Sequence, residues 1–170
     1  GEGARTISDP WPKGAMEAIG ADDTVFILGT SLTMVDVVLG LLKQGWQGKA
    51  IALSRRGLLP RAHTLSHAPA CPIPDEALNG PLSKRLHSAR KLAKQTEWQR
   101  VMDGYRLLTA ALWQDATQAQ RTRFLRHLRP WWDVHRHRIA PDAYETLEQL
   151  RHDGRLVVHS GRLQSVTHET

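Results

Sequence analysis

The pattern of apolar and polar positions changes twice between residues 24 and 56. A short run rich in β-branched residues, Thr24–Leu28, stops at Gly29. After it, apolar side chains recur at the spacing of one helix face, at Leu32, Val35, Leu39 and Leu42. Gly45 and Gly48 are typical of a helix end, and residues 50–53 form a second apolar run. The pattern predicts strand, helix and strand, about 30 residues in all, which is the length of a βαβ crossover.

The turn before this helix is a candidate phosphate site. A helix N-terminus beside the end of a strand offers N–H groups and a positive dipole end to an anion. A dinucleotide turn has the pattern G-x-G-x-x-G, and here the three places are Gly29, Ser31 and Met34. Ser31 adds a side chain where a pyrophosphate approaches the backbone, and Met34 predicts looser packing of helix on strand. A buried βαβ turn that binds nothing is the alternative interpretation.

The residues after the second strand favour the phosphate interpretation. Ser54, Arg55 and Arg56 follow the apolar run at once. In a dinucleotide fold this position meets the adenosine ribose, where an acid suits NAD and arginine suits the 2′-phosphate of NADP. Arginine keeps its charge and pairs phosphate with two hydrogen bonds. Two exposed arginines after a strand that bind nothing remain the simpler alternative.

Beyond residue 64 the pattern becomes helical. Residues 64–82 are rich in proline, which predicts an irregular linker, and helix formers follow. We expect helices at 82–95, 97–115 and 118–129, with Ser83 capping the first and Thr117 the third.

An α/β pattern returns near the C-terminal end. We expect a helix from Pro141 to about His152 and strands at 156–159 and 162–167. The fold class is therefore predicted as α/β, an incomplete Rossmann-like three-layer NAD(P)-binding domain with an all-helical insertion. The domain would comprise residues 1–64 and 139–170, and the linker and helical insertion subdomain residues 65–138.

Composition limits the classes of protein. A hydrophobic share of 41% and a charged share of 24% are ordinary for a globular chain. The single cysteine excludes internal disulfides and a four-cysteine zinc site, and it fits a cytoplasmic location. No apolar run reaches about 18 residues, so we expect no membrane partner.

The positive charge is concentrated in the helical part. The net charge is +6, whereas residues 84–106 carry 7 − 2 = +5 and residues 121–138 carry 6 − 1 = +5. A basic surface with tryptophans could contact nucleic acid or an acidic partner. Solvated helix faces with tryptophans in the core are the simpler interpretation, so nucleic acid is not our expected partner.

Three side chains could suggest metal or nucleophile chemistry. On a helix His135 and His137 would point about 200° apart, so one ion would not reach both. The sequence has no H-E-x-x-H and no cysteine pair. Cys71 lies in a proline-rich stretch without a helix N-terminus to activate it. We therefore predict no metal ligand and no catalytic residue.

Three strings carry a family resemblance. LGTSLTMVDVVLGLL, IALSRRGLLPRAH and LRPWWDVHRHRIAP resemble a bacterial family of FAD/NAD(P)-binding proteins related to two-dinucleotide flavoprotein oxidoreductases and monooxygenases. The resemblance implies NADP(H) as cofactor here and FAD in a full-length parent. It implies nucleotide contacts at Gly29, Thr30, Ser31, Leu32, Thr33, Ser54, Arg55 and Arg56.

The chain begins at Gly1 rather than methionine, and we expect it to be an internal fragment of such a flavoprotein. Its partners would be the dinucleotide and the remainder of the parent chain. The expected function is an NADPH-type binding module of a flavin-dependent oxidoreductase, inactive in isolation because the flavin that accepts the hydride is bound elsewhere. Two alternatives stay open: a non-enzymatic basic helical module that binds nucleic acid or an acidic partner, and a degenerate Rossmann-like scaffold that binds no nucleotide.

Overall fold

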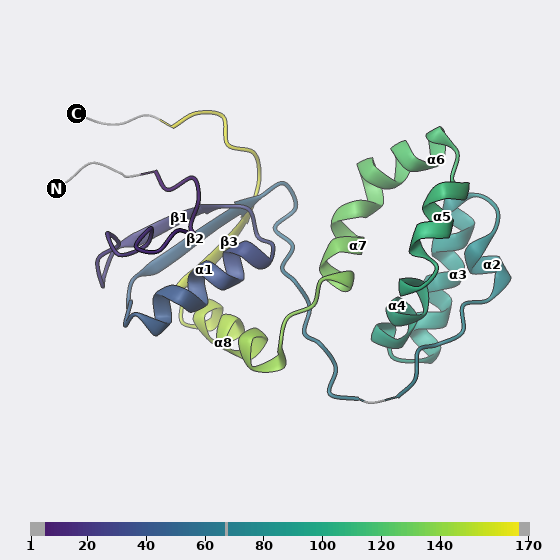
Figure 1. Ribbon diagram of the computed structural model, residues 1–170, viewed down its shortest axis with the longest axis horizontal. Coiled ribbons are helices and arrows are strands. Elements are labelled where there is room, and N and C mark those ends of the chain that lie inside the picture. The colour runs from purple at the N-terminus through teal and green to yellow at the C-terminus, as the bar shows by residue number, and fades with distance from the viewer. Residues whose placement is uncertain (1–5, 67, 167–170) are drawn as a thin grey trace. The chain divides into compact units, whose positions relative to one another are not determined.

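Three parallel strands organise one part of the protein. The computed structural model describes residues 6–66 and 68–166 (Figure 1). The strands β1 (Thr24–Leu28), β2 (Lys49–Ser54) and β3 (Leu156–Ser160) form one sheet in the order β1-β2-β3. Val25 is paired with Ala50, which is paired with Leu156. Residues 162–166 form no strand, so the predicted strand at 162–167 is wrong over its described part. Both edges of β2 are already occupied, by β1 and β3.

Two helices cover one face of this sheet. They are α1 (Leu32–Lys43) and α8 (Pro141–His152), which lie on the same side of the strands in Figure 1. Ala50 and Ala52 of the central strand are fully buried, and their small side chains let the helices approach closely. The core above them consists of Met34, Val35, Val38, Leu41, Leu147, Leu150 and Leu156.

The other face of the sheet carries apolar side chains in solvent. Phe26 is 50% exposed and Leu28 is 61% exposed. The predicted α/β class is therefore confirmed as a small parallel sheet with helices. The described residues of this part supply two layers, whereas the prediction was of three.

The first helix ends where the glycine pattern predicts. Gln44 is its last partly helical residue, and Gly45 has φ +85°, a conformation that L side chains rarely adopt. The Trp46 N–H donates to the Leu41 carbonyl at 3.1 Å and closes the last turn.

The chain forms two compact units. We call residues 1–60 and 142–170 the α/β unit, and residues 61–141 the helical unit. The sequence-based division differs in assigning residues 61–64 and 139–141 to the sheet domain. These short segments instead pair with each other, because Ala62 and Ile139 form a parallel bridge and the His63 N–H donates to the Ile139 carbonyl at 2.7 Å.

The helical unit is a chain of short helices. They are α2 (Asp75–Leu78), α3 (Leu82–Gln95), α4 (Trp98–Arg106), α5 (Thr109–Asp115), α6 (Gln118–Arg123), a π-helix η1 (Phe124–Leu128) and α7 (Arg129–Arg136). The helix predicted at 82–95 is confirmed, but its N-cap is Pro81 and not Ser83. Thr117 caps α6 as predicted, and Gln120 completes a capping box with it.

Two predicted helices are broken in the structure. The one at 97–115 divides into α4 and α5, because the Leu108 N–H bonds three residues back to Tyr105, and the Thr109 hydroxyl takes the same carbonyl at 2.8 Å. The one at 118–129 continues through η1 to Arg136. Pro130 lies in the first turn of α7 and has no N–H for the carbonyl four residues earlier, which favours a π-turn before it.

Candidate functional site

The turn after β1 has the backbone that a glycine permits. Gly29 has φ +115°, and apart from its own chain neighbours no described residue has an atom within 4 Å of the place where a Cβ would stand. The Gly29 N–H donates to the Leu53 carbonyl at 2.8 Å, so the turn is tied to the end of the neighbouring strand. A larger residue here would strain the backbone without causing a clash.

Thr30 joins the two segments that the sequence assigns to the nucleotide. Its side chain is buried, and its hydroxyl lies 2.5 Å from the Leu58 carbonyl and 2.9 Å from the Ser54 hydroxyl. A carbonyl can only accept, so the single Thr30 proton goes to Leu58 and Ser54 donates to Thr30. The Gly57 N–H in turn donates to Ser54 at 3.0 Å. The hydroxyls of Thr30 and Ser54 thus hold the loop after β2 against the turn after β1.

The N-terminus of α1 is open to solvent. Ser31 is the N-cap residue in an extended conformation, and within the described part of the chain its side chain makes no capping bond. Ser31, Leu32 and Thr33 are exposed, and the first turn has no acidic residue. The N–H groups of this turn and the hydroxyls of Ser31 and Thr33 can therefore be reached by an anion.

Arg55 and Arg56 are exposed and follow directly on β2. Because β1 and β2 are neighbouring parallel strands, their carboxyl ends lie at the same edge of the sheet. The structure thus brings together the segments 29–33 and 54–56, within one unit. Whether these residues bind a nucleotide stays a prediction.

The third position of the glycine pattern differs from expectation. Met34 is 2% exposed and belongs to the core between α1 and the sheet. The buried side chain fills the space that a glycine would leave, and whether the helix packs more loosely on the strand here stays a prediction.

Sequence reasoning missed the loop after the arginines. The Gly57 N–H donates and the Leu58 carbonyl accepts the hydrogen bonds that fix the turn, and neither residue was a candidate. The signal was a threonine between an apolar strand and an apolar helix, since a polar side chain in such a place needs a partner.

His135, a candidate for metal chemistry in the sequence, has hydrogen-bonding and aromatic partners within the helical unit. His135 lies in α7, donates from Nδ1 to the Trp131 carbonyl at 2.7 Å, and meets the Trp98 ring edge-on at 4.9 Å. Arg138, two residues after the end of α7, forms an ion pair with Asp103 and lies over the Trp98 ring at 5.9 Å. Among the described residues, no group of three His, Cys, Asp or Glu side chains could hold a metal ion.

Comparison of the chain with family models, curated proteins and solved structures finds no match. No helix in residues 6–66 and 68–166 has both the length and the apolar character needed to cross a membrane. What the α/β unit could bind is therefore argued below from its geometry.

Proposed function

We propose that the α/β unit binds a dinucleotide of the NADPH type, with its diphosphate at the N-terminus of α1. One observation carries this proposal. The open N-terminus of α1 and the Ser54–Arg56 segment lie at the carboxyl ends of two adjacent parallel strands, tied by the Thr30–Ser54 hydrogen bond. In open α/β sheets ligands bind outside the carboxyl ends of the strands.

The phosphate-binding groups would be main-chain N–H groups of Ser31, Leu32 and Thr33. Gly29 leaves open space beside them, and the helix dipole adds a positive partial charge. Ser31 occupies the place of the usual second glycine, so its side chain sets how closely a diphosphate approaches. The Ser31 hydroxyl is a donor that compensates in part for this distance.

Arg55 and Arg56 would hold the 2′-phosphate that distinguishes NADPH from NADH. Both are exposed at the end of β2, the position that contacts the adenosine ribose in dinucleotide folds. A guanidinium can pair a phosphate with two charge-assisted hydrogen bonds, whereas the 2′-hydroxyl of NADH offers it no anion.

The strand order and the two helices on one face also fit one half of a Rossmann-like domain. The parent would then be a flavin-dependent oxidoreductase in which FAD, bound elsewhere, takes the hydride. This unit would position the nicotinamide cofactor and supply no acid or base.

Isothermal titration of the whole chain with NADPH and NADH tests the proposal. We expect NADPH to bind about tenfold or more tightly than NADH, the difference that one lost charge-assisted phosphate contact makes. The variant Arg55→Ala should lower the NADPH affinity toward that of NADH and leave NADH binding unchanged.

Arg151→Ala is the matched control. Arg151 is an exposed arginine of the same unit, in the last turn of α8, which leads to the amino end of β3. This variant should keep the affinity for NADPH. Equal affinities for the two nucleotides would contradict the role of the arginines, and binding of neither would favour the scaffold alternative.

A further inference from the structure

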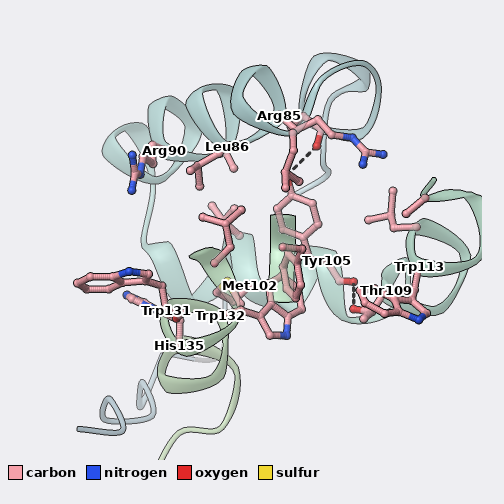
Figure 2. Close-up of a pocket in the computed structure, with 18 of the residues that line it drawn as sticks. Arg85, Leu86, Arg90, Met102, Tyr105, Thr109, Trp113, Trp131, Trp132 and His135 are labelled. Carbon is pink, nitrogen blue, oxygen red and sulfur yellow. Dashed lines mark hydrogen bonds between the residues drawn. The ribbon is translucent and has the colours of Figure 1, made fainter. Parts of the chain in front are cut away.

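The helical unit contains a cavity of its own. Its volume is about 410 Å³, within the range of small-molecule sites. Figure 2 shows side chains from several helices converging on it, and these are mostly aromatic and aliphatic. Leu86, Val101, Met102, Phe124, Trp131 and Trp132 are among them. All residues that line it belong to the helical unit, whereas the residues of the proposed nucleotide site belong to the α/β unit.

The polar groups deep in this cavity already have partners. The Tyr105 hydroxyl donates to the Ala77 carbonyl at 3.0 Å, and the Thr109 hydroxyl donates to the Tyr105 carbonyl. Burial raises the pKa of the Tyr105 hydroxyl above its ordinary value, so that it stays neutral. The interior therefore suits an apolar group, since a polar one would lose its hydrogen bonds to water without replacement.

Two of the arginines in the lining are also engaged. The Arg85 Nε donates to the Leu78 carbonyl at 2.5 Å. The Arg121 Nε donates to the Trp113 carbonyl at 3.0 Å, and its guanidinium lies over the Trp113 ring. Both guanidinium groups are held by these contacts.

Arg90 differs from them. It is an exposed residue of α3 that lines the cavity, and within the described part of the chain its side chain has no hydrogen bond or ion pair. In the view of Figure 2, Arg90 lies above Trp131 and His135 at one end of the cavity. Because Arg90 is both exposed and part of the lining, the cavity reaches the surface at this end.

The electrostatics of the cavity favour an anion. Its described lining includes three arginines and no Asp or Glu. The chain segments that form most of it, residues 84–106 and 121–138, each have a net charge of +5 (7 − 2 and 6 − 1). A carboxylate at Arg90 would pair with a cation in a positive environment.

The π-helix supplies part of the cavity wall. Phe124 and Leu128, the first and last residues of η1, both line the cavity, and the tryptophan pair of α7 follows at once. π-turns are rare in proteins, but where one occurs within an α-helix it is often at a functional site. Here the wider turn changes the phase of the helix, so that residues on both sides of it face the same space.

We propose that this cavity binds an amphipathic monoanion, an apolar chain that ends in a carboxylate. The chain fills the aromatic interior and the carboxylate pairs with Arg90. This site goes beyond the proposed nucleotide function, and neither depends on the other.

Isothermal titration with sodium dodecanoate, below its micelle concentration, tests the proposal on the whole chain. We expect saturable binding of one dodecanoate per chain and a change in tryptophan fluorescence, since Trp98, Trp113, Trp131 and Trp132 line the cavity. Arg90→Gln should weaken this binding about tenfold, the effect of losing one charge-assisted pair. Dodecyltrimethylammonium, with the same chain and the opposite charge, should bind at least tenfold more weakly than dodecanoate.

Lys91→Gln is the matched control, because Lys91 is the exposed neighbour of Arg90 on α3 and does not line the cavity. It should leave the affinity within about twofold, since a surface charge acts weakly. Ala89→Phe places a ring in the cavity and should abolish binding, with circular dichroism reporting that the helices remain. Absence of dodecanoate binding, equal binding of the cationic chain, or equal effects of Arg90→Gln and Lys91→Gln would overturn the proposal.

Discussion

At the residue scale, the positions that a dinucleotide pattern assigns to the ligand divide into two kinds. Thr30 and Ser54 hydrogen-bond to each other and to the loop at 57–58, and they fix the backbone of the turn. Ser31, Thr33 and Arg55 are exposed and can meet a ligand. Affinity should thus respond to the exposed set directly, and to the buried set only through the shape of the turn.

The buried tyrosine of the helical unit gives a prediction for alkaline pH. Burial raises the pKa of Tyr105 above 10.0, although the nearby Arg85 lowers it in part. A raised folded-state pKa means that the native state holds the proton more tightly. The resulting stability is fully present below pH 10 and is lost as pH rises through the folded-state pKa. We expect helical circular dichroism to hold up to about pH 10 and to fall above it.

Tyr105→Phe provides the comparison. It loses the hydrogen bond to Ala77, so its stability at neutral pH should be lower by about 1 kcal/mol. Because phenylalanine does not titrate, this variant should also not lose stability as the pH rises above about 10. An identical alkaline transition in this variant would show that another group is responsible.

At the scale of single elements, β1 has one covered face and one open face. Ile27 is half-buried on the side of α1 and α8, whereas the next side chain toward the N-terminus, Phe26, is 50% exposed. Ile27→Thr should lower the free energy of unfolding of the α/β unit by about 1–3 kcal/mol, because it removes apolar contact and places a hydroxyl on the covered face of the sheet. Phe26→Thr, on the same strand, should change it by about 0.5 kcal/mol or less.

Urea unfolding followed by circular dichroism measures both variants. Phe26→Thr should also lower the binding of an apolar dye to the native protein, because it removes part of an exposed apolar surface. Equal destabilisation by the two substitutions would contradict the conclusion that one face of β1 is covered and the other is exposed.

The sequence was sufficient for the elements that local chemistry determines. Four such signals determine structure only at neighbouring residues, and each prediction made from them is confirmed. They are the apolar runs of β1 and β2, the glycine after α1 and the threonine before α6. The break at Leu108 and the π-turn at 124–128 were not predictable in this way. They depend on which carbonyl accepts a given N–H or hydroxyl once the helices have packed. The apolar periodicity of the sequence continues across such positions and does not reveal them.

For the site, the sequence located both segments but not how they are joined. The bond from Thr30 to Ser54 spans 24 positions and follows from the pairing of β1 and β2. The cavity of the helical unit was missed because its tryptophans were assigned to a core. Trp131 is in fact 44% exposed and Trp113 is 40% exposed.

At the scale of the whole molecule, the two units carry separate proposals that separate experiments can address. The nucleotide titration concerns residues of the α/β unit, and the dodecanoate titration concerns residues of the helical unit. A variant of Arg55 should leave dodecanoate binding unchanged, and a variant of Arg90 should leave NADPH binding unchanged.

The bridge between Ala62 and Ile139 has a consequence for the order of folding. Pairing of β2 with β3 joins residues 54 and 160, and in an unfolded chain it closes a loop of about 100 residues. If the helical unit has already formed, its ends are held together at residues 62 and 139, and the loop behaves as one of about 30 residues. This shortening of the loop reduces the closure entropy by about 1.1 kcal/mol, roughly sixfold in rate.

We therefore expect the sheet to complete itself after the insertion has folded, although the insertion interrupts it in sequence. Ile139→Ala, which removes the buried side chain at the bridge, should slow the formation of the sheet severalfold in stopped-flow refolding. Leu112→Ala, in the same unit but away from its ends, should slow it less. Equal refolding rates for the sheet in both variants would mean that the strands meet without help from the insertion.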